Sequence, residues 1–413
     1  MSPPPGGSSS SPSTSTTDTP GATSTTDGDA TSDGAETTED GTTGGEIGCA
    51  DPGAPVACND GMVGEGEVCF AAVPVGIADG GTPRQLSVGD VDDDGNLDFA
   101  VADPEGNQIL VYRGNGDGTF TNPVALNGFS VRGIALGFIN ADASLDLAAL
   151  TNNGADYRIY SGDGTGGFAF SDSGAVGGPA TDIEIGDLDN DGDGDLVVPV
   201  WDAVHVLFGT GANFNPPTVL ALNGTVAGAE HIALAPMMGT SIDLVSSFFD
   251  TNNVGVFLNP GNGSLALDNS TTTGPGSDGP NDVETGDFDG DGQMDVVASV
   301  SPNDEVYILL NDGAGGLVPD IAPLAGDVVG VATGDFSGDC IDDLAMVRRS
   351  GAVYEVAFYA SGGDGGFDAP VVVGVPSAVE DIQLGDFNGD GLADALLTYG
   401  PMVPGIAIIE SQP

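Results

Sequence analysis

The sequence predicts an all-β fold built from seven copies of one unit, and two observations support this prediction. The first is composition: the 413 residues include 68 Gly, and only 6% are aromatic. Gly and Asp favour tight turns, whereas Val favours strands and strong helix formers are scarce. The second is an Asp-rich loop that recurs with a period near 50 residues, which is typical of repeat architectures.

The loop is clearest in the stretch Asp287-Phe-Asp-Gly-Asp-Gly-Gln-Met-Asp295. It has carboxylates at positions 1, 3, 5 and 9 and Gly292 at position 6, a spacing that resembles the first part of an EF-hand calcium loop. The residues from Asp295 to Val300 are rich in β-branched Val, however, and no Glu occupies position 12. The sequence therefore predicts a calcium loop between two strands rather than between two helices.

Each unit repeats the same order of elements. Apolar stretches flank the loop, a third apolar strand follows a polar turn, and a Gly-rich hairpin such as 115–120 or 362–367 leads into a poorer strand that often contains Pro. Gly supplies the positive φ of such hairpins, and Pro suits an outer edge strand. The first positions of the seven loops, 48 to 52 residues apart, are Asp90, Phe138, Asp187, Ala235, Asp287, Asp335 and Asp386.

Four strands in each of seven units predict a seven-bladed β-propeller over residues 65–413. The last unit ends after its third strand, and the missing hairpin end and Pro-containing strand are found near residues 64–75. An N-terminal strand would therefore complete the last blade and close the ring. An open solenoid, the alternative, has no reason to carry its missing piece at the opposite terminus.

The N-terminal part differs from the repeats. Residues 1–48 are Ser, Thr, Gly, Pro, Asp and Glu with almost no apolar residue, which predicts a disordered tether, either a stalk or a terminus without a role. Residues 49–64 form a short Cys-containing transition. No apolar run reaches 18 residues, so no transmembrane segment is predicted. No signal peptide follows Met1, so the export signal of a secreted form would have to lie elsewhere.

The formal net charge is −57, and all six basic residues are Arg. This charge argues against nucleic acid and anionic membranes as partners, because both are polyanions. Cations fit as partners. Adaptation to a salty medium would explain the same acidity, and composition does not separate the two explanations.

The loops of the form D-x-D-x-D-G-x-x-D, each followed by an apolar strand and a Gly-rich hairpin, resemble the FG-GAP (or VCBS) repeats of integrin α-chain head propellers and bacterial surface proteins. The resemblance implies an extracellular or cell-surface, calcium-binding module for binding or adhesion. Its protein or glycan ligand would lie on the face opposite the loops. Cys58 to Cys69 resembles a small cysteine-rich repeat of secreted bacterial proteins, which implies that these two Cys pair. The connectivity of Cys49 and Cys340 stays open.

Calcium takes six to eight oxygen ligands, whereas magnesium prefers a tight octahedron with water. Loops one, three, five and seven are predicted to bind Ca²⁺ strongly, with backbone carbonyls at position 7. Their ligands are Asp90, Asp92, Asp94, Asn96, Asp98, Asp187, Asp189, Asp191, Asp193, Asp195, Asp287, Asp289, Asp291, Gln293, Asp295, Asp386, Asn388, Asp390, Leu392 and Asp394. In loop six Cys340 replaces the turn Gly, which predicts a weaker site. Its ligands are Asp335, Ser337, Asp339, Ile341 and Asp343.

Two loops depart from the pattern. Loop two begins with Phe138 and has Ala143 in place of the turn Gly, so little or no binding is predicted. Loop four, counted from Ala235, keeps only its final Asp243 and is predicted to be empty. Calcium is thus expected to be structural, because each full loop gathers three or four carboxylates that repel one another without an ion.

The turns of the opposite face are predicted to carry the ligand site. They contain Trp201-Asp202, Phe249-Asp250, 301–304, Arg348-Arg349 and Tyr399. A secreted enzyme acting on polysaccharides or phospholipids is the alternative, and a spacer module is another. The chain has no Lys and only two His, and His205 lies in the middle of a predicted strand. Because no catalytic constellation can be identified, we expect no enzyme.

Overall fold

The computed structural model describes residues 68–71, 75–78, 82–211, 213–222, 226–272, 279–300, 305–319, 324–325, 327–351, 353–400 and 403–412. All belong to the unit Asp40–Pro413. Their strands form seven antiparallel sheets, six with four strands and one with five. One 3₁₀ helix, η1 (Phe249–Thr251), is the only helix of the described residues. The predicted tether (1–48) and transition (49–64) lie outside them.

Each sheet is one blade, and its strands follow one another from the innermost to the outermost. Blade one comprises β2 (Leu86–Gly89), β3 (Asp98–Asp103), β4 (Gln108–Tyr112) and β5 (Val124–Asn127). Blade two comprises β6 (Val131–Gly137), β7 (Asp146–Thr151), β8 (Asp156–Gly162) and β9 (Phe168–Ala175). Blade three comprises β10 (Glu184–Gly186), β11 (Asp195–Val200), β12 (Ala203–Leu207) and β13 (Thr218–Ala221). Blade four comprises β14 (Ala229–Ala235), β15 (Asp243–Phe248), β16 (Asn253–Leu258) and β17 (Ala266–Thr272).

The outer strand of blade five is divided, because both β21 and β22 pair with β20. Blade five comprises β18 (Pro280–Gly286), β19 (Asp295–Val300), β20 (Glu305–Asn311), β21 (Leu317–Pro319) and β22 (Leu324–Ala325). Blade six comprises β23 (Asp327–Gly334), β24 (Asp343–Ser350), β25 (Val353–Tyr359) and β26 (Val371–Val375). Blade seven comprises β27 (Val379–Gly385), β28 (Asp394–Tyr399), β29 (Gly405–Ile409) and β1 (Val75–Ala78).

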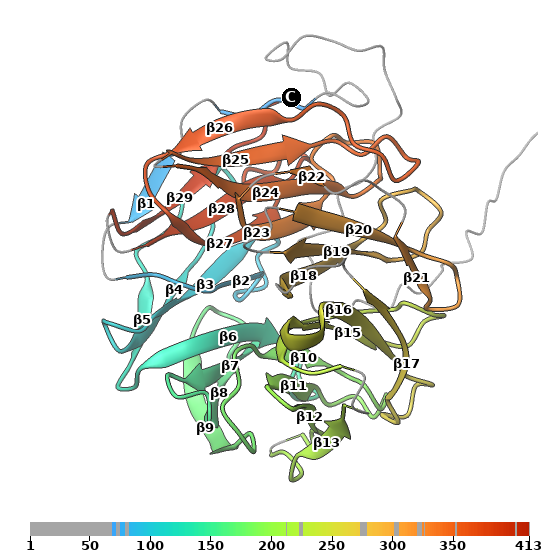
Figure 1. Cartoon of the computed structure of the whole chain (residues 1–413). Coiled ribbons are helices and arrows are strands. Elements are labelled where there is room, and N and C mark those ends of the chain that lie inside the picture. Colours follow the sequence, from blue (N-terminus) through green and yellow to red (C-terminus); the bar gives the residue numbers. More distant parts are fainter. Residues whose placement is uncertain are drawn as a thin grey trace, which may run out of the picture. The chain divides into compact units, whose positions relative to one another are not determined.

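The ring closes as the sequence predicts. The N-terminal strand β1 pairs antiparallel with β29, and the two lie side by side in Figure 1. Just before β1, Phe70 forms an isolated bridge with Ser411, as Phe120 does with Gly114 in blade one. Phe70 therefore ends the missing hairpin of blade seven. The innermost strands of consecutive blades contact one another all round, including β27 with β2. The predicted seven-bladed propeller is confirmed.

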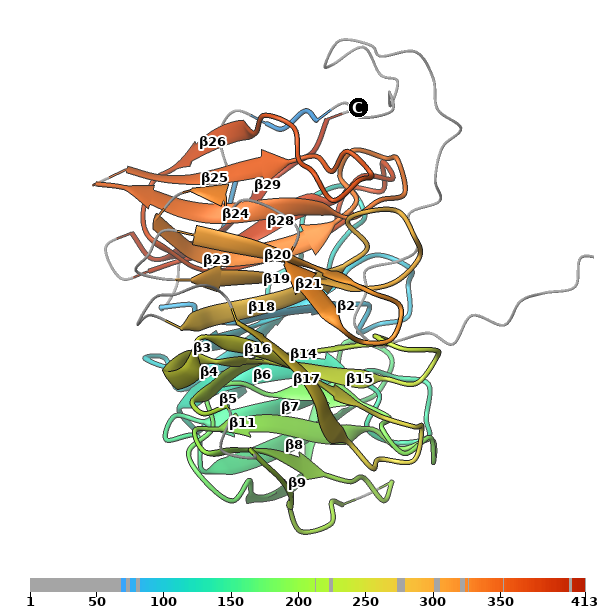
Figure 2. The same ribbon diagram turned by 45° about the vertical axis from the view of Figure 1, so that its right-hand side comes forward.

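The hydrophobic core lies between the blades. Seven clusters each join two neighbouring blades, and the seventh packs Leu396 and Ile408 of blade seven against Phe99 and Val101 of blade one. Second strands such as β3, β11 and β19 are buried along their whole length, because neighbouring sheets cover both of their faces. Figure 2 shows the sheets of blades four, five and six packed face to face. This packing explains why the second strands are continuous apolar runs.

The Asp-rich loops and the Gly-rich hairpins of neighbouring blades lie together on one face. A hairpin Gly of each of three blades donates its N–H to the carbonyl of position 2 in the preceding loop. The pairs are Gly118 with Phe387 (3.0 Å), Gly166 with Val91 (3.0 Å) and Gly263 with Leu188 (2.9 Å). The loops are therefore linked from blade to blade.

Candidate functional site

The Asp-rich loops are shaped by carboxylates that accept backbone N–H groups inside the same loop. The position 1 carboxylate accepts the N–H of position 6 in loops one, three, five, six and seven. These bonds are 2.8 Å (Gly95 to Asp90), 2.9 Å (Gly192 to Asp187), 2.8 Å (Gly292 to Asp287), 2.8 Å (Cys340 to Asp335) and 3.0 Å (Gly391 to Asp386). The position 5 carboxylate accepts the N–H of position 7, as Asp291 does from Gln293 at 2.9 Å. The 1-3-5 spacing thus folds one compact turn.

The turn needs left-handed backbone at two places, of which the sequence analysis predicted one. Position 6 has positive φ, +81° at Gly292 and +69° at Cys340. Position 4 does too, with +55° at Asp93 and +57° at Asn190. Asp and Asn tolerate this region better than other residues that carry a Cβ. Cys340 is the strained member of the set, and it is held in a disulfide, as is Cys69. Cys49 and Cys58 lie outside the described residues.

Three loops bring acidic side chains close enough to share one metal ion. In each, ligand atoms of three carboxylates lie within 4.8 Å of one another. The groups are Asp90, Asp92 and Asp98 in loop one, Asp187, Asp189 and Asp195 in loop three, and Asp287, Asp289 and Asp291 in loop five. Loops six and seven, in which position 3 is Ser337 or Asn388, are not among these groups.

Position 3 carries the clearest sign of a missing partner. One buried carboxylate oxygen of Asp92, one of Asp189 and the hydroxyl of Ser337 have no hydrogen-bond partner. All three occupy the same position, in loops one, three and six. A buried oxygen without a partner is costly, so three of them at one repeated position indicate an absent ligand.

Position 9 has a second role that the sequence analysis did not identify. In all seven blades its Oδ1 accepts the N–H of the residue that opens the hairpin, over distances of 2.6 to 2.9 Å. Its Oδ2 accepts a second N–H in the loop, from Val91, Leu188, Met238, Phe288, Phe336 and Phe387 in six blades. These Asp residues are at most 1% exposed. They fasten the loop to the hairpin.

Burial also sets the ionisation of these position 9 residues. Desolvation raises the pKa of Asp98, Asp195, Asp295 and Asp394 to about 7, and that of Asp343 to about 8, while the two accepted N–H groups oppose the rise. The neighbouring loop carboxylates add to the rise. A cation in the loop would offset both effects.

Loops two and four differ from the others in geometry as well as sequence. As in loop seven, where Asn388 donates to Asp394 over 3.3 Å, the side-chain amide of Asn140 donates to Asp146 over 2.9 Å, but position 1 of loop two is Phe138, which offers no side-chain ligand. No described residue of that loop has positive φ. In loop four Ala235 pairs with Asp243, as Gly89 pairs with Asp98, so Ala235 ends the inner strand and is not position 1. Counting loop four from Ala235 was wrong, because this loop is one residue shorter.

The predicted carbonyl ligands at position 7 are Asn96, Asp193, Gln293, Ile341 and Leu392. Each donates its backbone N–H to the carboxylate at position 5 of its loop, over 2.9 to 3.0 Å. These contacts fix the peptide on the N-terminal side of position 7. Ligation by the carbonyl on the other side stays a prediction.

On the opposite face, Trp201 is 48% exposed at the turn between β11 and β12. Two other residues predicted for that face are engaged elsewhere. Arg348 lies within β24 and donates to Glu355 (2.6 Å) and Tyr359 (3.1 Å), and Tyr399 is 4% exposed. Placing them in exposed turns was therefore wrong, since strands β24 and β28 extend through them. Residues 301–304 lie outside the described residues.

The innermost strands carry a polar belt around the ring centre, formed by Gln85, Asp182, His231, Asp282 and Asp381. Four of these residues accept the N–H of the next blade. The bonds join Gln85 to Ile134 (3.1 Å), Asp182 to Ile232 (3.3 Å), Asp282 to Val331 (3.1 Å) and Asp381 to Leu86 (2.6 Å). Gln85 also donates to Asp182 (3.1 Å). The belt thus ties blades across the centre.

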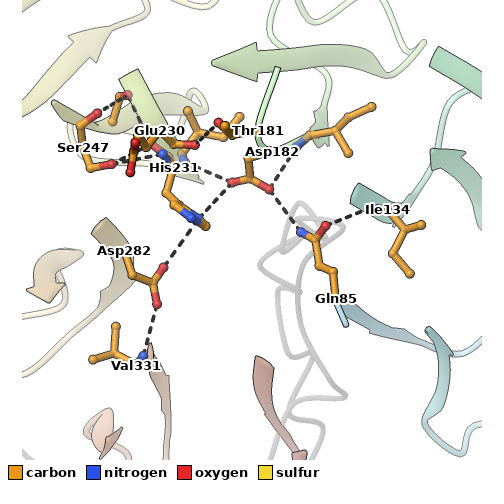
Figure 3. Close-up of polar contacts among 12 residues, drawn as sticks. Gln85, Ile134, Thr181, Asp182, Glu230, His231, Ser247, Asp282 and Val331 are labelled. Atoms are coloured by element: carbon orange, nitrogen blue, oxygen red, sulfur yellow. Dashed lines mark hydrogen bonds and ion pairs between the residues drawn. The ribbon is translucent and has the colours of Figure 1, made fainter. Parts of the chain in front are cut away.

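His231 completes the belt. Its Nδ1 lies 3.5 Å from a carboxylate oxygen of Asp182 and 3.7 Å from one of Asp282, so the ring stands between blades three and five (Figure 3). A cavity of about 1400 Å³ adjoins the belt and is lined by every innermost strand. Sequence reasoning gave His231 no role. A pattern that marks the belt was nevertheless present in the sequence: Gln85, Asp182, Asp282 and Asp381 all lie five residues before position 1 of their loops.

The belt predicts that stability falls as pH rises. Burial alone would lower the pKa of His231, but Asp182, Asp282 and Glu230 together raise it to about 10. A raised His pKa stabilises fully below its unfolded value of about 6.5, and this is lost as pH rises through about 10. Burial raises the pKa of Asp381 from 3.8 to about 7, so its contribution to stability also falls as pH rises, mainly between about pH 4 and pH 7. We expect the thermal midpoint to fall by a few degrees between pH 6 and pH 10.

The measurement is thermal unfolding of wild type, His231→Gln and His205→Gln at several pH values. His231→Gln should be less stable than wild type at pH 7, and its thermal midpoint should fall less than that of wild type between pH 8 and pH 10. His205 is buried with Nδ1 2.7 Å from the carbonyl of Val176, so His205→Gln is the control for loss of a buried imidazole outside the belt. Equal slopes in all three proteins would contradict the role of His231.

Comparison with known proteins agrees with this architecture. Residues 67–138 and 241–298 match the model of the FG-GAP-like repeat. No curated protein matches the chain. A solved Agrocybe aegerita lectin that recognises non-reducing terminal N-acetylglucosamine is 17% identical, with a TM-score of 0.50 over 75% of this chain and 83% of the lectin.

Two further solved structures share the fold. BBS1N, solved in complex with ARL6DN, is 14% identical, with a TM-score of 0.59 over 84% of this chain and 97% of the BBS1N chain. Saccharomyces cerevisiae Sqt1 is 13% identical, with a TM-score of 0.54 over 84% and 100% of the two chains. The fold and its repeats are those of a binding or scaffold module. Within the described residues, no helix is long and apolar enough to cross a membrane.

Proposed function

We propose that this FG-GAP repeat propeller is a calcium-stabilised binding module of the cell exterior, with ions in the Asp-rich loops and a protein or glycan ligand on the opposite face. The observation that carries the calcium part is the set of buried, unpartnered oxygens at position 3, on Asp92, Asp189 and Ser337. The donor set consists of hard oxygens, which calcium prefers. When bound, the ion would neutralise the gathered carboxylates and hold the strand-to-strand turn.

Occupancy should follow the ligands that each loop offers. Loops one, three, five and seven are proposed as the stronger sites. Loop six, with Ser337 at position 3 and Cys340 at position 6, is proposed as the weaker one. Loop two is proposed to bind no ion because Phe138 at position 1 offers no oxygen ligand and Ala143 replaces the turn Gly, and loop four because it lacks acids at positions 1, 3 and 5.

Two features support a location outside the cell. Cys69 and Cys340 are disulfide-bonded, and disulfides persist in oxidising compartments. A net charge of −57 also suits a protein that works among free calcium ions. The calcium loops would then be filled at extracellular calcium concentrations.

The ligand is proposed to contact the turns around Trp201. The Trp201 carbonyl accepts the N–H groups of Gly228 (2.9 Å) and Ala229 (3.2 Å), and the Gly228 carbonyl accepts that of Phe249 (2.8 Å). These hydrogen bonds join the turn of blade three that carries the exposed Trp201 to the turn of blade four that carries the partly exposed Phe249. Exposed aromatic residues on rigid backbone are common anchors for ligands. The two His residues serve the packing and the belt, which supports a binding role over catalysis.

The experiment is a glycan and protein array probed with the whole chain in calcium and in chelator. We expect ligand binding in calcium, with at least tenfold weaker binding by Trp201→Ala. Val219→Ala is the matched control, because Val219 is 54% exposed on the outer strand of the same blade. N-acetylglucosamine glycans belong in the array, since the Agrocybe aegerita lectin shares the fold. Binding that Trp201→Ala and Val219→Ala reduce equally would contradict the proposed face.

A further inference from the structure

In blades one, three, five and seven, a residue near the end of the third strand or just after it is placed beside the calcium loop. Tyr112 pairs with Phe99, the residue after position 9 of loop one, so Arg113 follows at the loop. The same register places Phe208, Leu310 and Glu410 in blades three, five and seven. We call these residues the flanking residues. They differ in charge, whereas the loop acids beside them are almost the same.

The side chain of the flanking residue is held by the next blade. A Cβ added to the hairpin residue Gly166 would lie 2.5 Å from Cδ of Arg113. Added to Gly118, it would lie 2.4 Å from Oε1 of Glu410. Both glycines have left-handed φ, +77° and +74°. Because these two hairpin positions carry no Cβ, the side chain of the flanking residue can run along the loop in the space that they leave.

In blade one the flanking residue binds a predicted calcium ligand. Nη1 of Arg113 lies 3.2 Å from Oδ2 of Asp92, and the Asp92 side chain is 13% exposed. The other oxygen, Oδ1, is buried without a partner. The guanidinium therefore occupies one oxygen of the position 3 carboxylate and places a positive charge beside the loop.

Blade seven has the opposite charge at this place. Position 3 of loop seven is the neutral Asn388, so this loop has three carboxylates, one fewer than loop five. Glu410 and Asn388 both border Gly118, whose added Cβ would lie 3.8 Å from Cβ of Asn388. Glu410 thus returns a negative charge near the position that lacks one.

We infer that the flanking residue sets the calcium affinity of its loop. Arg113 lowers the affinity of loop one below those of loops three and five, and Glu410 raises that of loop seven. The physical reason is charge: a cation a few ångströms from the ion repels it and competes for Asp92, whereas a carboxylate attracts it. This inference rests on the proposed calcium binding. It ranks the four loops that the sequence predicted together as strong sites.

The test is calcium titration by calorimetry of the whole chain and of four variants. Arg113→Leu introduces the residue of blade five and should tighten one site about tenfold. Leu310→Arg makes the reverse change and should weaken one site about tenfold. Glu410→Gln should weaken one site about threefold. The effects of Arg113→Leu and Leu310→Arg on calcium affinity should be smaller at 1 M salt, where charges are screened within about 3 Å.

Arg158→Leu is the matched control, since it removes one positive charge from β8, where Arg158 stacks 4.6 Å from the centroid of Phe129. It should leave every calcium affinity unchanged. Identical isotherms for Arg113→Leu, Arg158→Leu and wild type would overturn the inference while calcium binding itself stands. No calcium uptake by the wild type would instead overturn the proposed function. If Arg113→Leu fails to fold, Leu310→Arg alone decides, and an unchanged isotherm counts against the inference.

Discussion

Removal of calcium is expected to lower the stability of the propeller by roughly 7 kcal/mol. Five sites, each at ten times its Kd, contribute about 1.4 kcal/mol apiece by mass action. For a domain of about 350 residues, unfolding entropy near 2.1 cal/mol/K per residue converts this loss to a fall of about 10 °C in Tm. The measurement is thermal unfolding of the chain in about 10 mM calcium and in excess chelator, at the same pH and ionic strength.

Single-loop variants identify where this stabilisation arises. Asp287→Asn removes the position 1 carboxylate of loop five, so it should lower Tm by about 2 °C in calcium and by much less in chelator. Asp142→Asn is the control, because loop two is proposed to hold no ion. It should show the full wild-type response to chelator. A wild-type Tm that is the same in calcium and in chelator would show that the loops are ordinary turns.

The sequence predicted the ring because its period and loop spacing are local patterns. Each Asp-rich loop fixes where one strand ends and the next begins, and the strand missing from blade seven was recognisable as β1 at the other end of the chain. The error at Ala235 arose from counting back from Asp243, since only strand pairing shows that loop four is one residue shorter. Tyr399 and Arg348 were wrongly placed in turns. The ends of β24 and β28 are set by pairing with neighbouring strands of the blade, and the sequence alone does not show this pairing.

The belt and the flanking residues depend on contacts between blades, which a linear pattern does not contain. Asp182 and Ile232 are 50 residues apart in sequence, and the reason for an acid at 182 is the N–H that blade four presents to it. Arg113 likewise looks like an ordinary surface residue until Asp92 is found 3.2 Å away. A polar residue five positions before position 1 of loops one, three, five and seven was visible, but its role needed the ring.

Position 9 also has more than one role, and a substitution in loop four separates them. Asp243→Ala is expected to destabilise the propeller by about 4 kcal/mol, since it leaves one buried and one partly buried N–H group without acceptors, at about 1–3 kcal/mol each. These are the N–H of Asn259 (2.6 Å) and that of Met238 (2.8 Å). Asn259 in turn donates its side-chain amide to the Leu188 carbonyl in loop three (2.7 Å), so the loss extends to a neighbouring blade.

Because loop four offers no acids at positions 1, 3 and 5, the cost of Asp243→Ala should be the same in calcium and in chelator. A loss of about 4 kcal/mol corresponds to a fall of about 5 °C in Tm for a domain of this size. Asp243→Asn keeps one acceptor oxygen and should lose about half as much. Chemical unfolding measured with and without calcium checks this. A cost that appeared only in calcium would make Asp243 an ion ligand, whereas an equal cost makes position 9 the anchor of all seven loops, whether or not they bind an ion.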